Sequence, residues 1–445
     1  MHDRIRRLSR LLGIDRAVFY TVALRAWQFT AGPVTALLIA GFFHPDIQGY
    51  YYLFASLLAA QSFLELGFHV VILNAASHEW AKLDLDPQSQ ITGDADAHSR
   101  LISLGRLVFL WYAIVALLFV IGVGLGGYSF LVAKSVEGVD WTTPWIALVC
   151  LTALSLWSLP FHALLEGCNQ VATINRFRLW QAITGNLVVW LCVPLGAGLW
   201  TTVAVAIVKV VWEAYLLLIA YRPFFKPFLR PPTGPHIEWR NDLWPLQWRL
   251  AVQGAFSYFA FWLFTPMMSV HGLAVAGQMG MTWTVLTAIQ AAGLAWVQTR
   301  APRFGMLIAE GRYEELDQLF RRLTILSLAI VTTVAAAFWG VVYGLHALPH
   351  PLAERVLAPD ALAVFTLAII LYHVPHCQAF YIRAHKREML LFAGVASSIM
   401  IGLSVWWLGG RFGPIGAGAG YLAVIGLFVL PYQTLIWRRC RAERS

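Results

Sequence analysis

Long apolar stretches, separated by short polar ones, recur along the whole chain. A membrane-spanning helix needs about 20 mostly apolar residues, and twelve ranges are long enough: 17–43, 48–75, 102–132, 144–166, 178–200, 201–221, 243–270, 274–299, 322–346, 360–382, 388–409 and 412–437. The polar stretch 222–242 contains five prolines, which interrupt a regular helix. The pattern predicts an all-α polytopic membrane protein of about twelve spans. Its lobes are residues 1–221 and 243–445, and residues 222–242 are a cytoplasmic linker.

The composition supports this class. Of the 445 residues, 59% are hydrophobic and 12% are charged, whereas soluble domains carry about 25% charged residues. This excludes an ordinary soluble enzyme and a disordered chain. The five cysteines show neither CxxC nor His-paired spacing, so we expect no metal site and no disulfide framework. We see no P-loop and no GxGxxG that opens a helix after a strand, and we expect no cofactor.

The basic residues predict the orientation in the membrane. If the N-terminus is cytoplasmic, 27 of the 32 Lys and Arg residues fall on the cytoplasmic side and three on the other: Lys134, Arg355 and Arg411. Such a bias marks the cytoplasmic loops. The net charge of +9 therefore reflects topology and contacts with anionic lipid rather than nucleic-acid binding. The apolar run of the first span is too long for a signal peptide, so we expect an uncleaved first helix.

The two halves show a weak internal similarity. Arg25-Ala-Trp-Gln28 opens the first span, and Arg249 with Gln253 opens the seventh. Gln61 and Gln290 occupy comparable places in the second and eighth spans. Parallel repeats of this kind occur in transporters that hold substrate near the midplane between the halves.

Charged residues inside spans are costly and mark substrate or ion pathways. Arg25 and Arg249 would face each other across a cavity, and guanidinium groups bind diphosphate oxygens while staying charged. Gln28, Gln61, Gln253 and Gln290 would bind sugar hydroxyls, and Trp27 would stack on a sugar ring. Two simpler interpretations stay open: Arg25 pairs with Glu65, and Arg249 extends to the headgroups.

The remaining intramembrane charges are candidates for ion coupling or ion pairs. Glu65 and His69 are one turn apart on one expected helix face, and Lys209 and Glu213 form an i,i+4 pair. Glu65 and Glu213 are the carboxylates that could bind a proton or sodium ion. As alternatives, His69 packs between helices and the Lys209–Glu213 pair is structural.

Three segments resemble the multidrug/oligosaccharidyl-lipid/polysaccharide (MOP) exporter superfamily, and specifically its branch of O-antigen and exopolysaccharide flippases. They are Arg25 with GYYYLFASLLAAQSFLELGFHVVILNAAS (49–77), TRAPRFGMLIAEGRYEELDQLFRRL (299–323) and GRFGPIGAGAGYLAV (410–424). The resemblance implies a two-lobed, alternating-access flippase of a bacterial inner membrane. Its cargo would be an undecaprenyl-diphosphate oligosaccharide, and a first-helix arginine, here Arg25, would bind the diphosphate. Polysaccharide polymerases or glycosyltransferases would be pathway partners.

Other functions stay open. A drug or metabolite exporter of the same superfamily is one, although that branch usually has a first-helix acidic residue, and none lies between Ala17 and Phe43. A membrane polymerase, ligase or glycosyltransferase is less favoured, because the outer loops are short. The acidic pairs Asp84/Asp86 and Asp94/Asp96 are typical of a solvated loop. Scattered polar residues also disfavour a channel.

Overall fold

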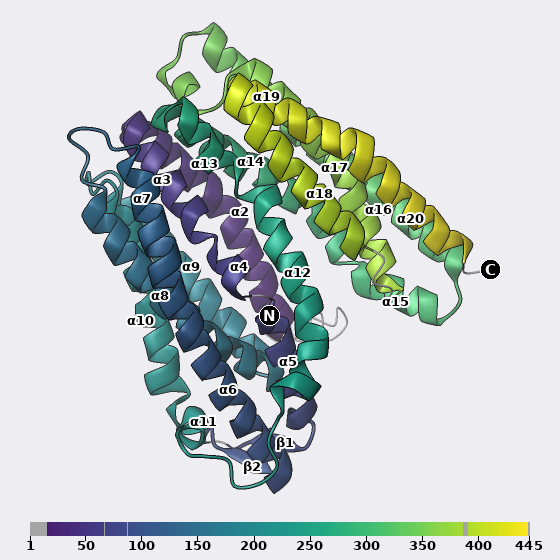
Figure 1. The fold of residues 1–445 in the computed structure, drawn as a ribbon. Helices are drawn as coiled ribbons and strands as arrows, with labels where there is room; N and C mark the ends of the chain where they lie inside the picture. The colour runs from purple at the N-terminus through teal and green to yellow at the C-terminus, as the bar shows by residue number, and fades with distance from the viewer. Residues whose placement is uncertain (1–15, 66, 87, 386–389, 444–445) are drawn as a thin grey trace, which may run out of the picture. The chain divides into compact units, whose positions relative to one another are not determined.

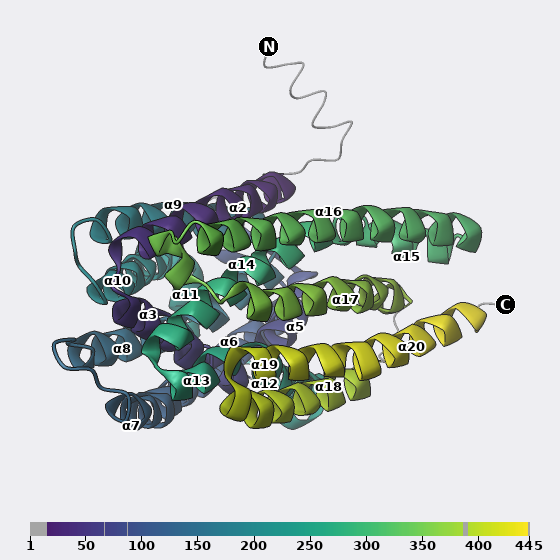
Figure 2. The same ribbon diagram turned by 90° about the horizontal axis from the view of Figure 1, so that it is seen from above.

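The computed structural model describes residues 16–65, 67–86, 88–385 and 390–443. Almost every described element is an α-helix, and the helices divide into two compact units (Figures 1 and 2). The N-terminal unit comprises the described residues up to Phe43 together with Leu58–Gly254. The C-terminal unit comprises His44–Leu57 and the described residues from Ala255 onward. The proposed linker boundary at 222–242 stays a prediction.

The N-terminal unit is a bundle of long helices with one small hairpin. Its helices are α2 (Arg16–Phe42), α4 (Gln61–Glu65), α5 (Phe68–Trp80), α6 (Ala95–Phe119), α7 (Gly126–Val132), α8 (Thr142–Gly167), α9 (Val171–Cys192), α10 (Trp200–Tyr215), α11 (Arg222–Phe225) and the start of α12 (Trp244–Phe261). A π-helical stretch, Val120–Leu125, joins α6 to α7, and another, Leu216–Ala220, extends α10.

The second expected span is not one helix, which corrects the sequence interpretation. It consists of three helices, α3 (Pro45–Leu58), α4 and α5, and the last two are separated by a break at residues 66 and 67. Gly67 at this break has φ 65°, a conformation that glycine adopts without strain, and a Cβ there would lie 2.7 Å from Leu250 Cβ. Glu65 and His69 therefore belong to different helices rather than to one face of a single helix.

The acidic segment after α5 is also more ordered than the expected solvated loop. Strands β1 (Leu83–Leu85) and β2 (Ile91–Gly93) pair antiparallel, with Leu83 opposite Gly93. Asp86 accepts a hydrogen bond from the Gln90 amide at 2.6 Å. Asp94 caps α6 by accepting one from the Ala97 amide at 2.8 Å, a standard role for Asp at a helix N-terminus. These two carboxylates hold the hairpin turn and the helix start.

The proline-rich segment packs along α6. It forms only short helical turns, α11 and Lys226–Leu229, each with a proline in its first positions, where no amide hydrogen is required. The Ser99 and Ser103 hydroxyls of α6 accept hydrogen bonds from the amides of Gly234, at 2.9 Å, and Ile237, at 3.1 Å. The rings of Phe224, Phe225 and Phe228 contact one another. The segment is thus fixed to its own unit.

The C-terminal unit contains a helix from early in the sequence. Its helices are α3, α13 (Phe264–Met268), α14 (Leu273–Gln298), α15 (Ala301–Ala309), α16 (Tyr313–Ala347), α17 (Pro359–Ala384), α18 (Leu391–Ser404), α19 (Gly410–Val424) and α20 (Leu430–Ala442), with the end of α12. The buried Gln48 of α3 donates to the carbonyls of Gly277, at 3.1 Å, and Arg355, at 2.9 Å. A Cβ on Gly277 would lie 2.9 Å from the Gly49 nitrogen, so only glycine permits this approach of α3 to α14.

Within the described residues every expected span overlaps a helix or a run of consecutive helices, although α9 begins and ends several residues before the expected span 178–200. Within the described part of the chain, seven helices are long and apolar enough to cross a membrane, or up to eight if Pro45–Glu65 and α5 together are one span. That count treats α18–α20 as one helix, although Gly413, with φ 63° and ψ −150°, interrupts it at the start of the last expected span, 412–437. Large apolar side chains such as Leu37 and Leu427 are exposed on the helix surfaces. The all-α polytopic prediction is confirmed.

Candidate functional site

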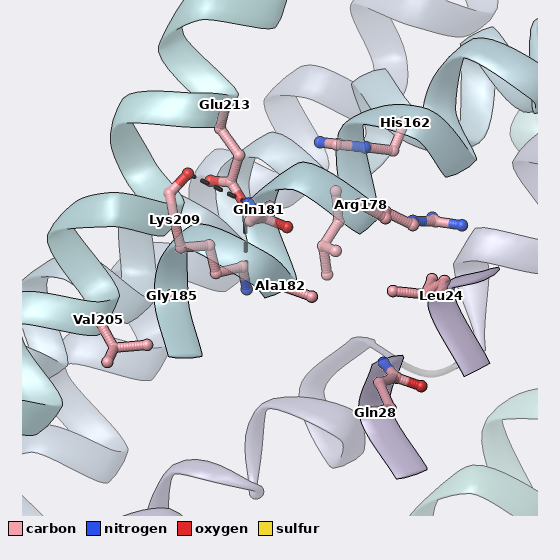
Figure 3. Close-up of a pocket in the computed structure, with 11 residues that line it drawn as sticks. Leu24, Gln28, His162, Arg178, Gln181, Ala182, Gly185, Val205, Lys209 and Glu213 are labelled. Atoms are coloured by element: carbon pink, nitrogen blue, oxygen red, sulfur yellow. Dashed lines mark hydrogen bonds and ion pairs between the residues drawn. The ribbon is translucent and has the colours of Figure 1, made fainter. Parts of the chain in front are cut away.

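A cavity of about 370 Å³ lies within the N-terminal unit, among α2, α8, α9 and α10 (Figure 3). All four helices belong to the same unit, so the cavity is a property of that bundle alone. The lining combines apolar, amide and charged side chains: Leu24, Gln28, Leu159, His162, Arg178, Gln181, Ala182, Gly185, Val205, Lys209 and Glu213.

On one wall, α10 supplies a lysine and a carboxylate. Lys209 Nζ lies 3.9 Å from Glu213 Oε1, and the two side chains are 42% and 6% exposed. The carboxylate is therefore buried while the ammonium group is accessible. Gln181 of α9 donates a hydrogen bond to the Lys209 carbonyl at 3.3 Å, as Figure 3 shows, which joins the two helices. Because Lys209 is the exposed member of the pair, its charge is available to a molecule in the cavity.

A charged cluster centred on Glu166, near the end of α8, adjoins the cavity through Arg178. The Glu166 carboxylate lies 2.5 Å from the Arg178 guanidinium and 3.5 Å from His69 Nε2. Its side chain is only 10% exposed. The pairs connect α5, α8 and α9. Arg178 also lines the cavity, so one guanidinium serves both the buried carboxylate and the open space.

The cavity includes some of the residues expected from the sequence. Gln28, Lys209 and Glu213 line it together. Trp27 packs against Trp190, with ring centroids 5.8 Å apart, and its Nε1 is buried without a partner among the described residues. Arg25 is exposed on α2, between two lining positions, Leu24 and Gln28. Among the described side chains, no salt bridge joins Arg25 to Glu65.

Other expected residues lie elsewhere. Gln61 begins α4 and is half-buried, and Glu65 ends that helix. Gln290 belongs to the C-terminal unit, where its side-chain nitrogen lies 3.2 Å from His376 Nδ1. Arg249 and Gln253 are in the helical backbone of α12, but their side chains lie outside the described part of the structure. The facing arginines stay a prediction.

Sequence reasoning missed Glu166, Arg178 and His162. The expected span begins at residue 178, so Arg178 was counted among the cytoplasmic charges, but α9 begins at Val171, which places Arg178 about two turns inside the helix. The actual turn is at Asn169, whose φ is +61°. The polar pair Asn169-Gln170 was the available signal, because Asn is the non-glycine residue most tolerant of this conformation.

Comparison with known proteins identifies structures of similar fold. No protein-family model matches the sequence, and no curated protein matches it. A solved multidrug-resistance MATE family transporter of the MOP superfamily, in an inward-facing conformation, is 13% identical with a TM-score of 0.65; the match covers 94% of this chain and 96% of that one. The lipid II flippase MurJ, in an inward closed conformation, is 13% identical with a TM-score of 0.65; here the match covers 95% and 87%.

A third similar structure is a MOP superfamily transporter from Pyrococcus furiosus, which is 11% identical with a TM-score of 0.55. This match covers 97% of this chain and 95% of that one. All three neighbours are transporters rather than enzymes. At these identities the likeness establishes the fold and leaves the cargo open. The chain is thus a multi-pass, all-helical membrane protein with the fold of the MOP superfamily transporters.

Proposed function

We propose that the chain is an alternating-access flippase that moves a lipid-linked diphosphate oligosaccharide across a bacterial inner membrane, with both termini in the cytoplasm. The observation that carries the proposal is the cavity of the N-terminal unit. It presents the cations Arg178 and Lys209 beside two amides, Gln28 and Gln181.

The charges of the cavity fit an anionic headgroup. Glu166 offsets part of the Arg178 charge, but the Arg178 side chain is 36% exposed and keeps donors for a ligand. Arginine offers a planar fork that matches phosphate oxygens, and lysine adds a point charge. The Gln28 and Gln181 side chains can hydrogen-bond to sugar hydroxyls. Leu24, Leu159 and Val205 supply the apolar lining typical of small-molecule sites.

The known cargo of one structural neighbour agrees with this chemistry. MurJ is a flippase for lipid II, and a lipid-linked precursor is therefore a cargo that this fold accommodates. In our proposal Arg25 and Arg249 also contact the diphosphate, and Gln61, Gln253 and Gln290 contact the glycan. The enzymes that build or polymerise that glycan would be partners in the same pathway.

Energy coupling is proposed for the N-terminal unit, with Glu213 as its first candidate. This carboxylate is buried at the cavity wall, and its Lys209 partner is 3.9 Å away. Glu65 and His69 are the other candidates of this unit.

Export of a drug or metabolite is the second candidate function. It is favoured by the Glu213 carboxylate at the wall of the same cavity, for which a cationic compound would have to replace Lys209 as the partner. The MATE transporter matches the fold as closely as the flippase does.

The test is a translocation assay in proteoliposomes with an undecaprenyl-diphosphate-linked disaccharide as probe. We expect wild type to expose the probe on the far leaflet and Arg178→Ala to lose at least about tenfold in rate, since one charge-assisted pair is worth roughly 1.5–3 kcal/mol. Arg176→Ala is the matched control, because Arg176 is on the same helix but does not line this cavity. It should transport like wild type.

Two outcomes would reject the flippase. One is equal loss in both arginine variants, which would indicate a general charge effect. The other is an inactive wild type that is folded and transports a cationic dye instead, which would establish the exporter. Arg178→Lys keeps the ion pair with Glu166. If this variant folds but still transports more slowly, the loss comes from weaker binding of the probe and not from unfolding.

A further inference from the structure

A second cavity, of about 410 Å³, opens between α9 and α10. These two helices pack against each other within the N-terminal unit (Figure 1). Each helix contributes three side chains in the same i, i+1, i+4 pattern: Arg176, Phe177 and Trp180, and Val211, Trp212 and Tyr215. We call this cavity the aromatic groove. None of its residues lines the cavity of Figure 3.

The aromatic groove is on the surface of the N-terminal unit. Successive residues of an α-helix are about 100° apart, so Arg176 and Trp180 are on a different face of α9 from Arg178, which lines the first cavity. The side chains of Trp180, Val211 and Tyr215 are 50%, 60% and 43% exposed. The groove is therefore open to a molecule from outside the unit.

Three packed rings form the floor of the groove. The ring centroid of Phe177 lies 5.7 Å from that of Trp212 and 5.8 Å from that of Tyr215, and the last two are 6.0 Å apart. The Trp212 indole nitrogen donates a hydrogen bond to the Thr184 hydroxyl at 2.9 Å, so its polar atom is already satisfied by the protein. What this floor offers to a ligand is thus a fixed apolar surface.

The polar groups of the groove are unused. Arg176 is exposed, and within the described part of the chain its side chain forms no ion pair and no hydrogen bond. The Trp180 indole nitrogen and the Tyr215 hydroxyl also make no hydrogen bond to described residues. All three groups can donate, and none of the six lining residues is acidic. The complementary ligand is therefore an anion, and a guanidinium group matches phosphate oxygens best.

The groove is more polar at one end than at the other. Arg176 follows Val171, the first residue of α9, by five residues, and Tyr215 is the last residue of α10. Trp180 and Val211 are each about 6 Å further from these helix ends. Both helix ends are cytoplasmic in the proposed orientation. The charged end is then at the level of the cytoplasmic headgroups and the apolar end points towards the bilayer centre, which is the polarity of a phospholipid.

We propose that the aromatic groove binds one anionic phospholipid of the cytoplasmic leaflet. Arg176 pairs with the phosphate, the Trp180 and Tyr215 donors bind the oxygens of the headgroup and the ester, and an acyl chain lies on the rings of Phe177 and Trp212. The aromatic rings alone would attract a quaternary ammonium group, but the Arg176 charge repels it and no carboxylate offsets that charge in the groove. The site is therefore selective for a lipid without a cationic headgroup.

The test is photo-crosslinking of the full-length chain in vesicles of mixed phosphatidylcholine and phosphatidylglycerol. Each lipid is supplied in turn as a probe with a diazirine on the same acyl carbon, and peptide mass spectrometry measures the label on residues 176–180 and 211–215. In wild type we expect phosphatidylglycerol to label these residues at least about fivefold more than phosphatidylcholine, which is the effect of one basic residue on an anionic lipid. Arg176→Gln should bring this ratio close to one, and Trp180→Phe, which keeps a ring but loses the N–H, should lower it in part.

Arg439→Gln is the matched control. It removes another exposed arginine that is expected on the cytoplasmic side, but Arg439 is in α20 and does not line the groove, so the ratio should stay at the wild-type value. Label elsewhere on the chain, from the phosphatidylcholine probe, checks that each variant is folded.

Three results would overturn the proposal. Equal labelling by both probes in wild type would indicate contact with bulk lipid only, and preferred labelling by phosphatidylcholine would indicate a choline on the rings. An equal fall of the ratio in Arg176→Gln and Arg439→Gln would indicate attraction by the net charge. No cargo is present, so the flippase can fail while this site stands. In vesicles of zwitterionic lipid alone the groove lacks its ligand in every variant, and Arg176→Ala is then still a valid control for translocation.

Discussion

At the scale of single residues, Glu166 shows how a buried carboxylate organises the N-terminal unit. It contacts Arg178 of α9 and His69 of α5, and it lies on α8. Breaking a buried pair typically costs about 3–5 kcal/mol, because the remaining charge is unpaired. Since the Arg178 side chain is 36% exposed, water reduces this penalty to roughly 1–3 kcal/mol. Glu166 is thus mainly a residue that positions Arg178.

Arg25 gives a prediction at the same scale. Arg25→Ala should abolish translocation of the diphosphate probe while leaving abundance near wild type, because the side chain is exposed and makes no described salt bridge. Arg25→Lys should retain partial activity, since it keeps the charge but not the bidentate geometry. Initial rates in proteoliposomes, normalised to protein content, measure both.

The double variant Arg25→Ala/Glu65→Ala is the control. Recovery of transport in this variant would show that Arg25 serves to neutralise Glu65, and the binding role would then be rejected.

At the scale of elements, the proline-rich segment behaves as part of the helical bundle. Phe228 packs where Gly105 of α6 lacks a side chain, and a Cβ on Gly105 would lie 2.2 Å from the Phe228 ring. The Arg106 guanidinium donates to the Leu229 carbonyl at 3.2 Å. The segment therefore depends on one glycine for its place on α6.

Gly105→Ala should displace the segment from α6. Overpacking of this kind costs about 1–3 kcal/mol, so we expect a lower melting temperature and faster proteolysis within 222–242. Gly122→Ala in the same long helix is the control, because nothing lies within 4 Å of its added Cβ. If both variants melt and cleave alike, the predicted role of Gly105 is wrong.

The spans could be predicted from the sequence because each is a long apolar run. The break at Gly67 and the β1–β2 hairpin could not. The break depends on the close approach of Leu250, which is remote from Gly67 in the sequence. The strands of the hairpin are too short and too polar to show the alternation of apolar and polar residues that predicts a β-strand.

The candidate site was predicted in part. Gln28, Lys209 and Glu213 were visible as polar residues inside apolar runs. Arg178 and Glu166 were not, because they lie near the ends of their spans, and only the positions of the turns decide whether such a charge is in a loop or in a helix. Boundaries are the least certain feature of any sequence-based assignment.

At the scale of the whole molecule, the distribution of basic residues predicts the orientation. In a cysteine-free variant, Glu137→Cys should react with a membrane-impermeant maleimide in intact cells, because the stretch after α7 is expected outside. Thr233→Cys should react only after permeabilisation. Both positions are exposed, so whether the maleimide reacts with each cysteine depends on the side of the membrane on which that residue lies. The reverse pattern would invert the proposed topology.

The place of α3 has a consequence for synthesis. Gln48 precedes its partner Gly277 by 229 residues, and ribosomes add roughly 5–20 residues per second. After Gln48 has been made, roughly 10–45 s pass before Gly277, whose carbonyl accepts its hydrogen bond, is synthesised. During that interval the Gln48 amide and the surface of α3 around Gly49 lack the partners that α14 supplies. α3 must therefore wait for the helices of its own, C-terminal unit to be made, and this interval is when an insertion chaperone would find it.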